Sequence, residues 1–500
     1  MLAERTVAGK RTAMRRLFTV LLLTGTAFGP AACREQPEGV INAIVIGQAQ
    51  PQLQDPALGP VSPKDAVLLQ NVAQGLVRFD ATGNIVSGLA ERWNVSDDGL
   101  SYIFRLAPAN WPDGKKITAQ QVSRLLKRQL AARSRNSLKD ALGATEDIVA
   151  MTDRVIEIRL ISPRPNFLAL LAQPELAILR DNEGTGPFKV MPAAKDEAGL
   201  RLSRAIATVD EEVTQREEVQ LAAAPVADAI RTFAAGKADL VMGGTYDDLP
   251  LAQRTKLPRN ALRFDPASGL FGLIPVGNGG GLDDPEVRNL LSQAFDRSNY
   301  ISVLGVPGLA PRATLVEPGL SDIAAPVAPA WFGTPFADRL ANLRSESDRL
   351  FGAEKPTVRV MIPEGPGGDL LLRELSRDWG AIGLTVVRVA SRREADFAVI
   401  DEVAPSTSAA WFVRRFRCGV VPVCDTEADG LMDAARATLI PAQRYALLGQ
   451  AAGRIDDAVL FIPITAPVRW SLTSSRIQGF AVNRYARHTL TGLEQQPGRN

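Results

Sequence analysis

Residues 71–122 read NVAQGLVRFDATGNIVSGLAERWNVSDDGLSYIFRLAPANWPDGKKITAQQV. Within this stretch, Ser101–Leu106 carries Tyr, Phe and Leu at every second position, which predicts a strand with one apolar face. Thr118 and Gln121 have the spacing of a capping box, so we expect a helix to begin there. Three clusters containing Asp, Gly or Asn predict turns at 80–84, 97–99 and 112–114. The stretch therefore predicts a small unit of mixed helix and strand, and these features alone indicate no function.

The order of these motifs resembles the signature of the extracytoplasmic solute-binding proteins of family 5, which serve ABC importers of oligopeptides, dipeptides and nickel. Six residues match the family's W-x-D-G…T-A-x-x-V run position by position: Trp111, Asp113, Gly114, Thr118, Ala119 and Val122. Two further segments, 184–190 with its G-T-G-P-F turn and 270–300, also resemble the family. The similarity spans about 42–493 and weakens in 306–345 and 401–425. It implies an α/β, two-lobed periplasmic binding protein fold of the large type II class with an extra N-terminal subdomain.

The resemblance also implies how the chain divides. We expect a lipoprotein signal peptide in 1–33, a first lobe in 34–60, 163–268 and 470–500, an extra subdomain of that lobe in 61–162, and a second lobe in 269–469. Within the second lobe, strand, helix and strand patterns follow one another in Thr357–Ile362, Asp369–Ile382 and Leu384–Val389. This β–α–β order predicts that the second lobe is α/β as well.

Composition and motifs exclude several classes of function. The formal net charge of +2 gives no electrostatic reason to bind nucleic acid. The single histidine, His488, excludes metal sites built from several histidines and a His-based catalytic triad elsewhere. The sequence has no G-x-S-x-G, H-E-x-x-H or Walker-type Gly-Lys-Ser/Thr motif. We therefore expect a monomeric binding protein that is not an enzyme and uses no cofactor or metal, and we expect His488 at the surface.

The N-terminus has the parts of a secretory signal. The basic pair Arg15–Arg16 precedes the short apolar run Leu17–Phe28 and then small residues. Cys33 follows two alanines and resembles the lipidated cysteine of a bacterial lipobox, although Pro30 stands where that motif usually has Leu. The alternative is an ordinary signal peptide cleaved nearby. The resemblance to lipoproteins predicts a location in the periplasm or cell envelope, with lipid at Cys33 attaching the protein to a membrane.

Two further cysteines, Cys418 and Cys424, lie six residues apart. In an oxidising compartment, we expect these two to form a disulfide. A redox-active or metal-binding pair is the alternative, but the spacing is not C-x-x-C and no histidine is close in the sequence.

The resemblance suggests ligand-binding residues in three places. Gln50 stands where the family has an acidic residue at its ligand cleft, and Asn278 matches a segment that follows the first crossing between the lobes. In the third place, peptide-binding members carry a W-x-x-D-Y-x-D-P run whose aspartate grips the α-amino group of the ligand. Here the region from 400 to 418 reads IDEVAPSTSAAWFVRRFRC, and its candidates are Asp401, Glu402, Trp411 and Arg414.

The charges in this altered region support two interpretations. Asp401 or Glu402 supplies a negative charge for an amine. Arg414, Arg415 and Arg417 favour a ligand carboxylate, or they form a solvated basic face.

The leading hypothesis is therefore a substrate-binding lipoprotein that captures peptides or a similar small solute between two lobes. Its partners would be the permease and ATPase subunits of an ABC importer. The alternatives are a receptor for a non-peptide solute, and a non-transport lipoprotein, such as a sensor or chaperone, on the same fold.

Overall fold

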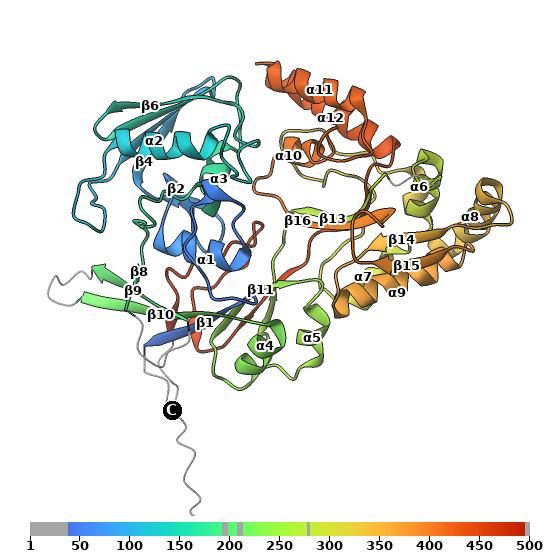
Figure 1. Cartoon of the computed structure of the whole chain (residues 1–500), viewed down its shortest axis with the longest axis horizontal. Coiled ribbons are helices and arrows are strands. Elements are labelled where there is room, and N and C mark those ends of the chain that lie inside the picture. The colour runs from blue at the N-terminus through green and yellow to red at the C-terminus, as the bar shows by residue number, and fades with distance from the viewer. Residues whose placement is uncertain (1–38, 193–198, 208–213, 278–280, 496–500) are drawn as a thin grey trace, which may run out of the picture. The chain divides into compact units, whose positions relative to one another are not determined.

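The computed structural model describes residues 39–192, 199–207, 214–277 and 281–495 (Figure 1). Three predicted features lie outside the described residues, namely the signal peptide, Cys33 and Asn278. The segment Glu38–Asn500 forms one compact unit. It contains a seven-stranded sheet, a five-stranded sheet and a four-stranded sheet, which we call the first sheet, the second sheet and the subdomain sheet.

The first sheet is built around β1, which pairs in parallel with β10 and β11. The remaining pairs are antiparallel, and the order across the sheet is β12 (Leu262–Phe264), β18 (Arg469–Thr473), β11 (Leu240–Thr245), β1 (Val40–Ile46), β10 (Thr214–Ala224), β9 (Leu200–Ala207) and β8 (Lys189–Val190). The helices that accompany the first sheet in the described residues are α1 (Pro63–Val72), α4 (Val226–Ala234) and α5 (Leu249–Arg254). Ile41, Ala43 and Val45 fill one side of its core because alternate side chains of β1 point the same way.

The subdomain sheet is the unit predicted from residues 71–122. Its order is β4 (Ala90–Val95), β5 (Ser101–Leu106), β7 (Val155–Leu160) and β6 (Thr145–Thr152), accompanied by α2 (Ala119–Leu130), α3 (Phe167–Leu171) and the hairpin of β2 (Val77–Phe79) and β3 (Ile85–Ser87). The predicted apolar face of β5 is confirmed, because Tyr102, Phe104 and Leu106 are buried. The capping box of Thr118 and Gln121 is confirmed as well.

The predicted extra subdomain of 61–162 includes one helix that lies elsewhere. Leu68 and Val72 of α1 pack in the same core as Ile41 of β1. The four-stranded sheet instead has a core of its own, which contains Phe104 and Ile156. The helix therefore belongs by its packing to the first sheet.

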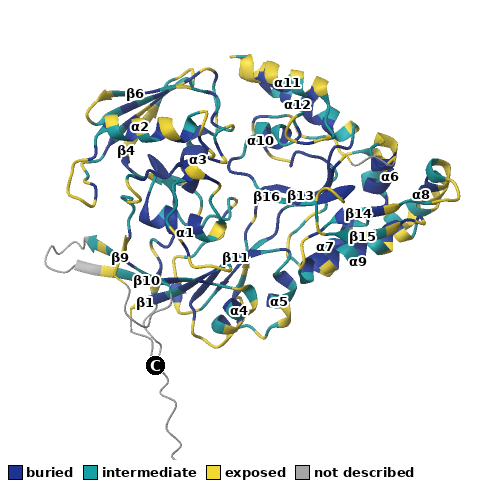
Figure 2. Cartoon of the chain, viewed as in Figure 1, coloured by how far each residue is buried: buried dark blue, intermediate teal, exposed yellow. Residues whose placement is uncertain are grey.

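The second sheet has the order β15 (Thr385–Val389), β14 (Thr357–Met361), β16 (Phe397–Val403), β13 (Gly269–Pro275) and β17 (Ile462–Thr465). Its helices are α6 (Pro285–Gln293), α7 (Arg297–Leu304), α8 (Phe336–Phe351), α9 (Pro366–Gly380), α10 (Ala409–Arg414), α11 (Thr426–Ala437) and α12 (Pro441–Asp457). The β–α–β prediction is confirmed, because β14 and β15 are parallel strands joined by α9. Every residue of β13, which lies between β16 and β17, is buried (Figure 2).

The chain passes twice between the first and second sheets. It leaves β12 at Phe264 and enters β13 at Gly269, and it returns from β17 at Thr465 to β18 at Arg469. The sequence predicts lobe boundaries after residues 268 and 469. Residue 268 is the last residue of the first connection, whereas residue 469 is already the first residue of β18. The remaining regular elements are short: 3-10 helices Pro56–Leu58, Pro174–Leu176 and Ala330–Gly333, and the pair β19 (Ile477–Gln478) and β20 (Glu494–Gln495).

The surface position expected for His488 is wrong. Only 6% of His488 is exposed, and its ring packs 4.8 Å from that of Phe480. Its Nε2 lies 3.1 Å from the carboxylate of Asp265, in the first connection between the sheets. The C-terminal segment therefore folds back over the crossing, and nearness to the chain end did not predict exposure.

Candidate ligand-binding site

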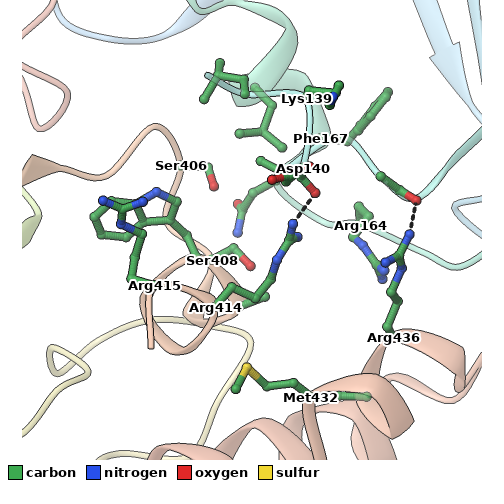
Figure 3. Close-up of a pocket in the computed structure, with 18 of the residues that line it drawn as sticks. Lys139, Asp140, Arg164, Phe167, Ser406, Ser408, Arg414, Arg415, Met432 and Arg436 are labelled. Carbon is green, nitrogen blue, oxygen red and sulfur yellow. Dashed lines mark hydrogen bonds between the residues drawn. The ribbon is translucent and has the colours of Figure 1, made fainter. Parts of the chain in front are cut away.

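A cavity of about 520 Å³ lies between two parts of the chain that are far apart in sequence (Figure 3). One wall comes from residues 130–170 beside α3, and the other comes from residues 406–448, which include α10, α11 and α12. Cavities of roughly 300–1,000 Å³ are typical for small-molecule ligands. The dimensions of this cavity therefore suit a small solute.

Arginine is the characteristic side chain of this cavity. Six arginines line it: Arg164, Arg414, Arg415, Arg417, Arg436 and Arg444. Two of them reach across from the second wall to the first. Arg414 donates to the carbonyl of Asp140, and Arg436 donates to the carbonyl of Gly143 at 2.7 Å (Figure 3).

Three further contacts join the same two parts of the chain, in the walls or within a few residues of them. Gln173 donates to the carbonyl of Pro405 at 2.7 Å, and the hydroxyl of Thr407 donates to the side-chain oxygen of Asn166 at 3.1 Å. The hydroxyl of Ser162 donates to the Arg436 carbonyl at 3.1 Å. The two walls are therefore in contact around the cavity.

Two of the six arginines form ion pairs. Arg415 pairs with Glu402, and Arg417 pairs with Asp433 at 2.8 Å. Among the described residues, the other four form no ion pair, and we call them the cavity arginines: Arg164, Arg414, Arg436 and Arg444. The cavity is therefore strongly positive.

The cavity arginines act on one another electrostatically. Burial, and then the charges of Arg444, Arg414 and Arg436, lower the pKa of Arg164 to about 9, whereas Asp322 raises it. Burial also lowers the pKa of Arg414 and of Arg444. Guanidinium groups stay protonated in proteins, so all four carry charge at neutral pH. Asp322 offers limited compensation because its carboxylate already accepts hydrogen bonds at residues 408 and 409.

Two of the residues predicted from sequence line this cavity. Trp411 and Arg414 both lie on α10, and Trp411 packs edge-on against Phe412 with ring centroids 5.0 Å apart. Phe412 is fully buried, so it anchors the helix whose other side chains reach the cavity.

The two predicted acids do not line the cavity. The Asp401 carboxylate accepts hydrogen bonds of 2.8 and 2.9 Å from Arg469, and Glu402 pairs with Arg415. Burial raises the pKa of Asp401, and the charge and hydrogen bonds of Arg469 act in the opposite direction. Both carboxylates therefore have cationic partners within the chain, and their role towards a ligand stays a prediction.

Gln50 also has a partner within the chain. Its side-chain amide donates to the carbonyl of Ala223 and accepts from the Ala223 N–H, both at 3.0 Å. The amide thus pairs with the backbone near the end of β10, as a neighbouring strand does. Ligand binding by Gln50 stays a prediction.

Cys418 and Cys424 are joined by a disulfide in the loop between α10 and α11. The loop carries Arg417, whose guanidinium reaches Asp433 of α11. The disulfide therefore lies beside one end of the cavity wall.

Sequence reasoning missed three of the four cavity arginines. Arg164 lies between two prolines after β7, Arg436 lies on α11 and Arg444 lies on α12. None of the three has another basic residue beside it in the sequence. A single arginine on a helix usually points to the solvent, so the sequence offers no reason to place these residues in a binding site. Only the packing of the two walls brings the three together.

No group of three or more His, Cys, Asp or Glu side chains suited to a metal ion occurs in the part of the chain that the structure describes. Across those same residues, no helix has both the length and the hydropathy needed to cross a membrane.

Comparisons with known proteins identify the family. The model of the bacterial extracellular solute-binding proteins, family 5 middle region, matches residues 84–336. The chain is 24% identical over 479 residues to a probable di/tripeptide-binding protein 5 of Pseudomonas aeruginosa (strain UCBPP-PA14), which covers 83% of this chain and 88% of that protein.

Solved structures share the fold. Haemophilus influenzae OppA in complex with RPPGFSPFR has a TM-score of 0.75 and 16% identity, with 92% of this chain and 99% of that chain covered. The PBP AgaA from A. tumefaciens R10, in complex with agropinic acid, has a TM-score of 0.69 and 19% identity, with 92% and 99% covered. These matches confirm the predicted α/β fold of two-lobed periplasmic binding proteins. Because the family model matches more than half of the sequence, this chain belongs to the bacterial extracellular solute-binding proteins of family 5.

Proposed function

We propose that this protein captures a peptide or a similarly small solute outside the cytoplasm and delivers it to the permease of an ABC importer. The observation that carries the proposal is the position of the cavity. It lies where two walls from distant parts of the chain meet, and the chain passes between the two main sheets only at 264–269 and 465–469 within the described residues. Hinge closure around a ligand uses this kind of arrangement.

Peptide is the first solute class to test. The relative from Pseudomonas aeruginosa is described as a di/tripeptide-binding protein, and the Haemophilus influenzae structure contains a nine-residue peptide. A cavity of about 520 Å³ suits a short peptide better than a long one. We therefore expect peptides of two or three residues to bind more tightly than longer ones.

A non-peptide solute is the second candidate. The AgaA structure has the same fold with agropinic acid bound, so the fold accepts other small acids. The cavity arginines favour an acidic solute of either kind. In both cases the protein acts as a receptor and not as an enzyme, and ATP hydrolysis belongs to another subunit.

Native mass spectrometry of the full chain, purified from the cell-envelope fraction of its bacterial host, tests the proposal. Released ligand is identified by tandem mass spectrometry. A mixture of short peptides supports peptide import, and a single non-peptide mass replaces the ligand class while keeping the receptor role. If the protein carries nothing and binds neither peptides nor organic acids in calorimetry, the receptor function is rejected in favour of a sensor or chaperone.

A further inference from the structure

Arg444 is the most buried of the four cavity arginines, and it has fewer partners than two other buried arginines of this protein. The other three cavity arginines each donate to a backbone carbonyl: Arg164 to residue 163, Arg414 to residue 140 and Arg436 to residue 143. Arg288 is 2% exposed and donates to the carbonyls of residues 283, 458 and 459. Arg297 is 3% exposed and donates to residues 292, 295 and 463. Arg444 is 4% exposed, yet its buried Nε has no hydrogen-bond partner among the described residues.

A buried guanidinium N–H without a partner is costly. A buried donor without a partner costs about 1–3 kcal/mol, and more when it is charged. Bringing several like charges together adds repulsion, which contributes, after burial, to the lowered pKa of Arg164. A binding site tolerates such an arrangement when a ligand supplies the missing negative charge.

We propose that the ligand is a small anion with at least two carboxylate or phosphate groups, and that Arg164, Arg414, Arg436 and Arg444 bind those groups. This inference rests on the proposed receptor function and names its solute class. Guanidinium groups suit it because their planar N–H donors bind carboxylate and phosphate in pairs. Four positive charges also exceed what one carboxylate neutralises.

A second, larger cavity has the opposite character. It has a volume of about 1,180 Å³ and is lined by Asp456 and Asp457, without Arg or Lys among its described lining residues. All of its lining residues come from 289–463, so it lies within one half of the chain. Its acidic lining does not suit an anion, and it does not lie between two distant parts of the chain as the first cavity does.

Isothermal titration calorimetry of the full-length protein tests the inference with four probes: the dipeptides Glu-Glu, Ala-Ala and Lys-Lys, and O-phosphoserine. We expect Glu-Glu or O-phosphoserine to bind at least about tenfold more tightly than Lys-Lys, with affinity that falls as salt rises. The two acidic probes distinguish carboxylate from phosphate. Equal affinity for Glu-Glu, Ala-Ala and Lys-Lys overturns the inference and leaves peptide binding intact.

Single substitutions locate the anion. Arg444→Gln and Arg164→Gln are each expected to weaken the preferred acidic probe by about tenfold or more. Arg92→Gln is the matched control, because it removes the same charge from an exposed position on β4 of the subdomain sheet. It is expected to change affinity less than about twofold.

Two further results keep the test decisive. If Arg444→Gln does not fold, Arg436→Gln replaces it, because Arg436 is exposed and its loss leaves no buried donor. Unchanged affinity for the acidic probes in folded Arg164→Gln and Arg436→Gln overturns the inference. Binding of O-phosphoserine without any dipeptide keeps the anion site and rejects the peptide. Absence of binding by all four probes overturns the inference.

Discussion

Arg469 of β18 donates hydrogen bonds of 2.8 and 2.9 Å to the carboxylate of Asp401 on β16, and one of 3.1 Å to its carbonyl. β18 belongs to the first sheet and β16 to the second, so this ion pair joins the two sheets beside the returning connection. The side chains are 17% and 15% exposed. The pair therefore holds together the region about which the two halves would move.

Arg469→Met is expected to lower the free energy of unfolding by about 3 kcal/mol, because it leaves a largely buried carboxylate without its cation. Adding Asp401→Asn to that variant is expected to recover part of the loss, because the unpaired charge is then absent. Urea denaturation of the two single variants and the double variant measures the coupling. Additive losses in the double variant would show that the two side chains do not stabilise the fold as a pair.

Asp401→Asn also tests whether this carboxylate binds the α-amino group of a peptide. Since Arg469 already occupies the carboxylate, we expect peptide affinity to change less than about threefold. The control is the same peptide with an acetylated N-terminus, which has no amine to bind. A loss of about tenfold that disappears with the acetylated peptide would restore Asp401 to the site.

Stability is expected to depend on pH through Asp456. Burial raises the pKa of this carboxyl to about 7, and the neighbouring charge of Asp457 contributes, while a hydrogen bond from the N–H of Leu315 opposes the shift. The unfolded chain loses the same proton near pH 4. Between about pH 4 and 7 the folded state holds more protons, so the free energy of unfolding falls as pH rises through that window.

Asp456→Asn is expected to remove this part of the pH dependence, because an amide keeps the acceptor for Leu315 without titrating. The gain in unfolding free energy over wild type should grow by roughly 2 kcal/mol from about pH 5 to pH 8. Urea denaturation at the two pH values measures it, with the exposed and distant carboxylate substituted, Asp97→Asn, as control. A parallel pH dependence in wild type and Asp456→Asn would assign the effect to other groups.

The motif that identified the family has a structural role in this protein. Trp111 is 2% exposed, and its indole N–H donates to Gln121 at 3.0 Å. Arg180 lies over the Trp111 ring at 4.6 Å and pairs with Asp113 at 2.7 Å. The W-x-D-G run therefore contacts both the start of α2, through Gln121, and the loop that follows η2 (Pro174–Leu176), through Arg180.

Trp111→Ala is expected to lower the free energy of unfolding by about 3–5 kcal/mol through loss of buried area and a cavity. Far-UV circular dichroism during urea denaturation measures the change. The partly buried Trp93 of the same core provides the control, and Trp93→Ala should cost clearly less. If both variants lose the same free energy of unfolding, Trp111 contributes no more to stability than another tryptophan of this core.

The sequence predicted most of the fold because its signals are local. Periodicity and capping located β5 and the start of α2, and the β–α–β order located β14, α9 and β15. One strand contains a proline, because β17 runs through Pro463. Proline is tolerated there because β17 lies at the edge of the second sheet, and the pairing with β13 shifts register beside it.

The site was less predictable because its residues meet only through tertiary packing. Arg414 was found because it lies in a basic run, whereas Arg164 and Arg444 are 280 positions apart in the sequence with nothing local to mark them. The acids chosen from the resemblance, Asp401 and Glu402, have arginine partners that the sequence does not reveal. Pairing of charges across elements decides which arginines are available to a ligand.

Attachment to a membrane through lipid on Cys33 stays a prediction, and one substitution tests it. If Cys33 is the lipidated residue, Cys33→Ser should move the protein from the membrane fraction to the soluble extracytoplasmic fraction, since a lipid anchor supplies about 0.8 kcal/mol per buried CH₂ group. Immunoblots of the two fractions, with metabolic labelling by a clickable fatty acid, measure location and lipid together. Cys418→Ser, in the disulfide, is the control and should leave the label unchanged. A soluble, unlabelled wild-type protein would instead favour an ordinary signal peptide, in agreement with the proline at position 30, where lipidated proteins usually have leucine.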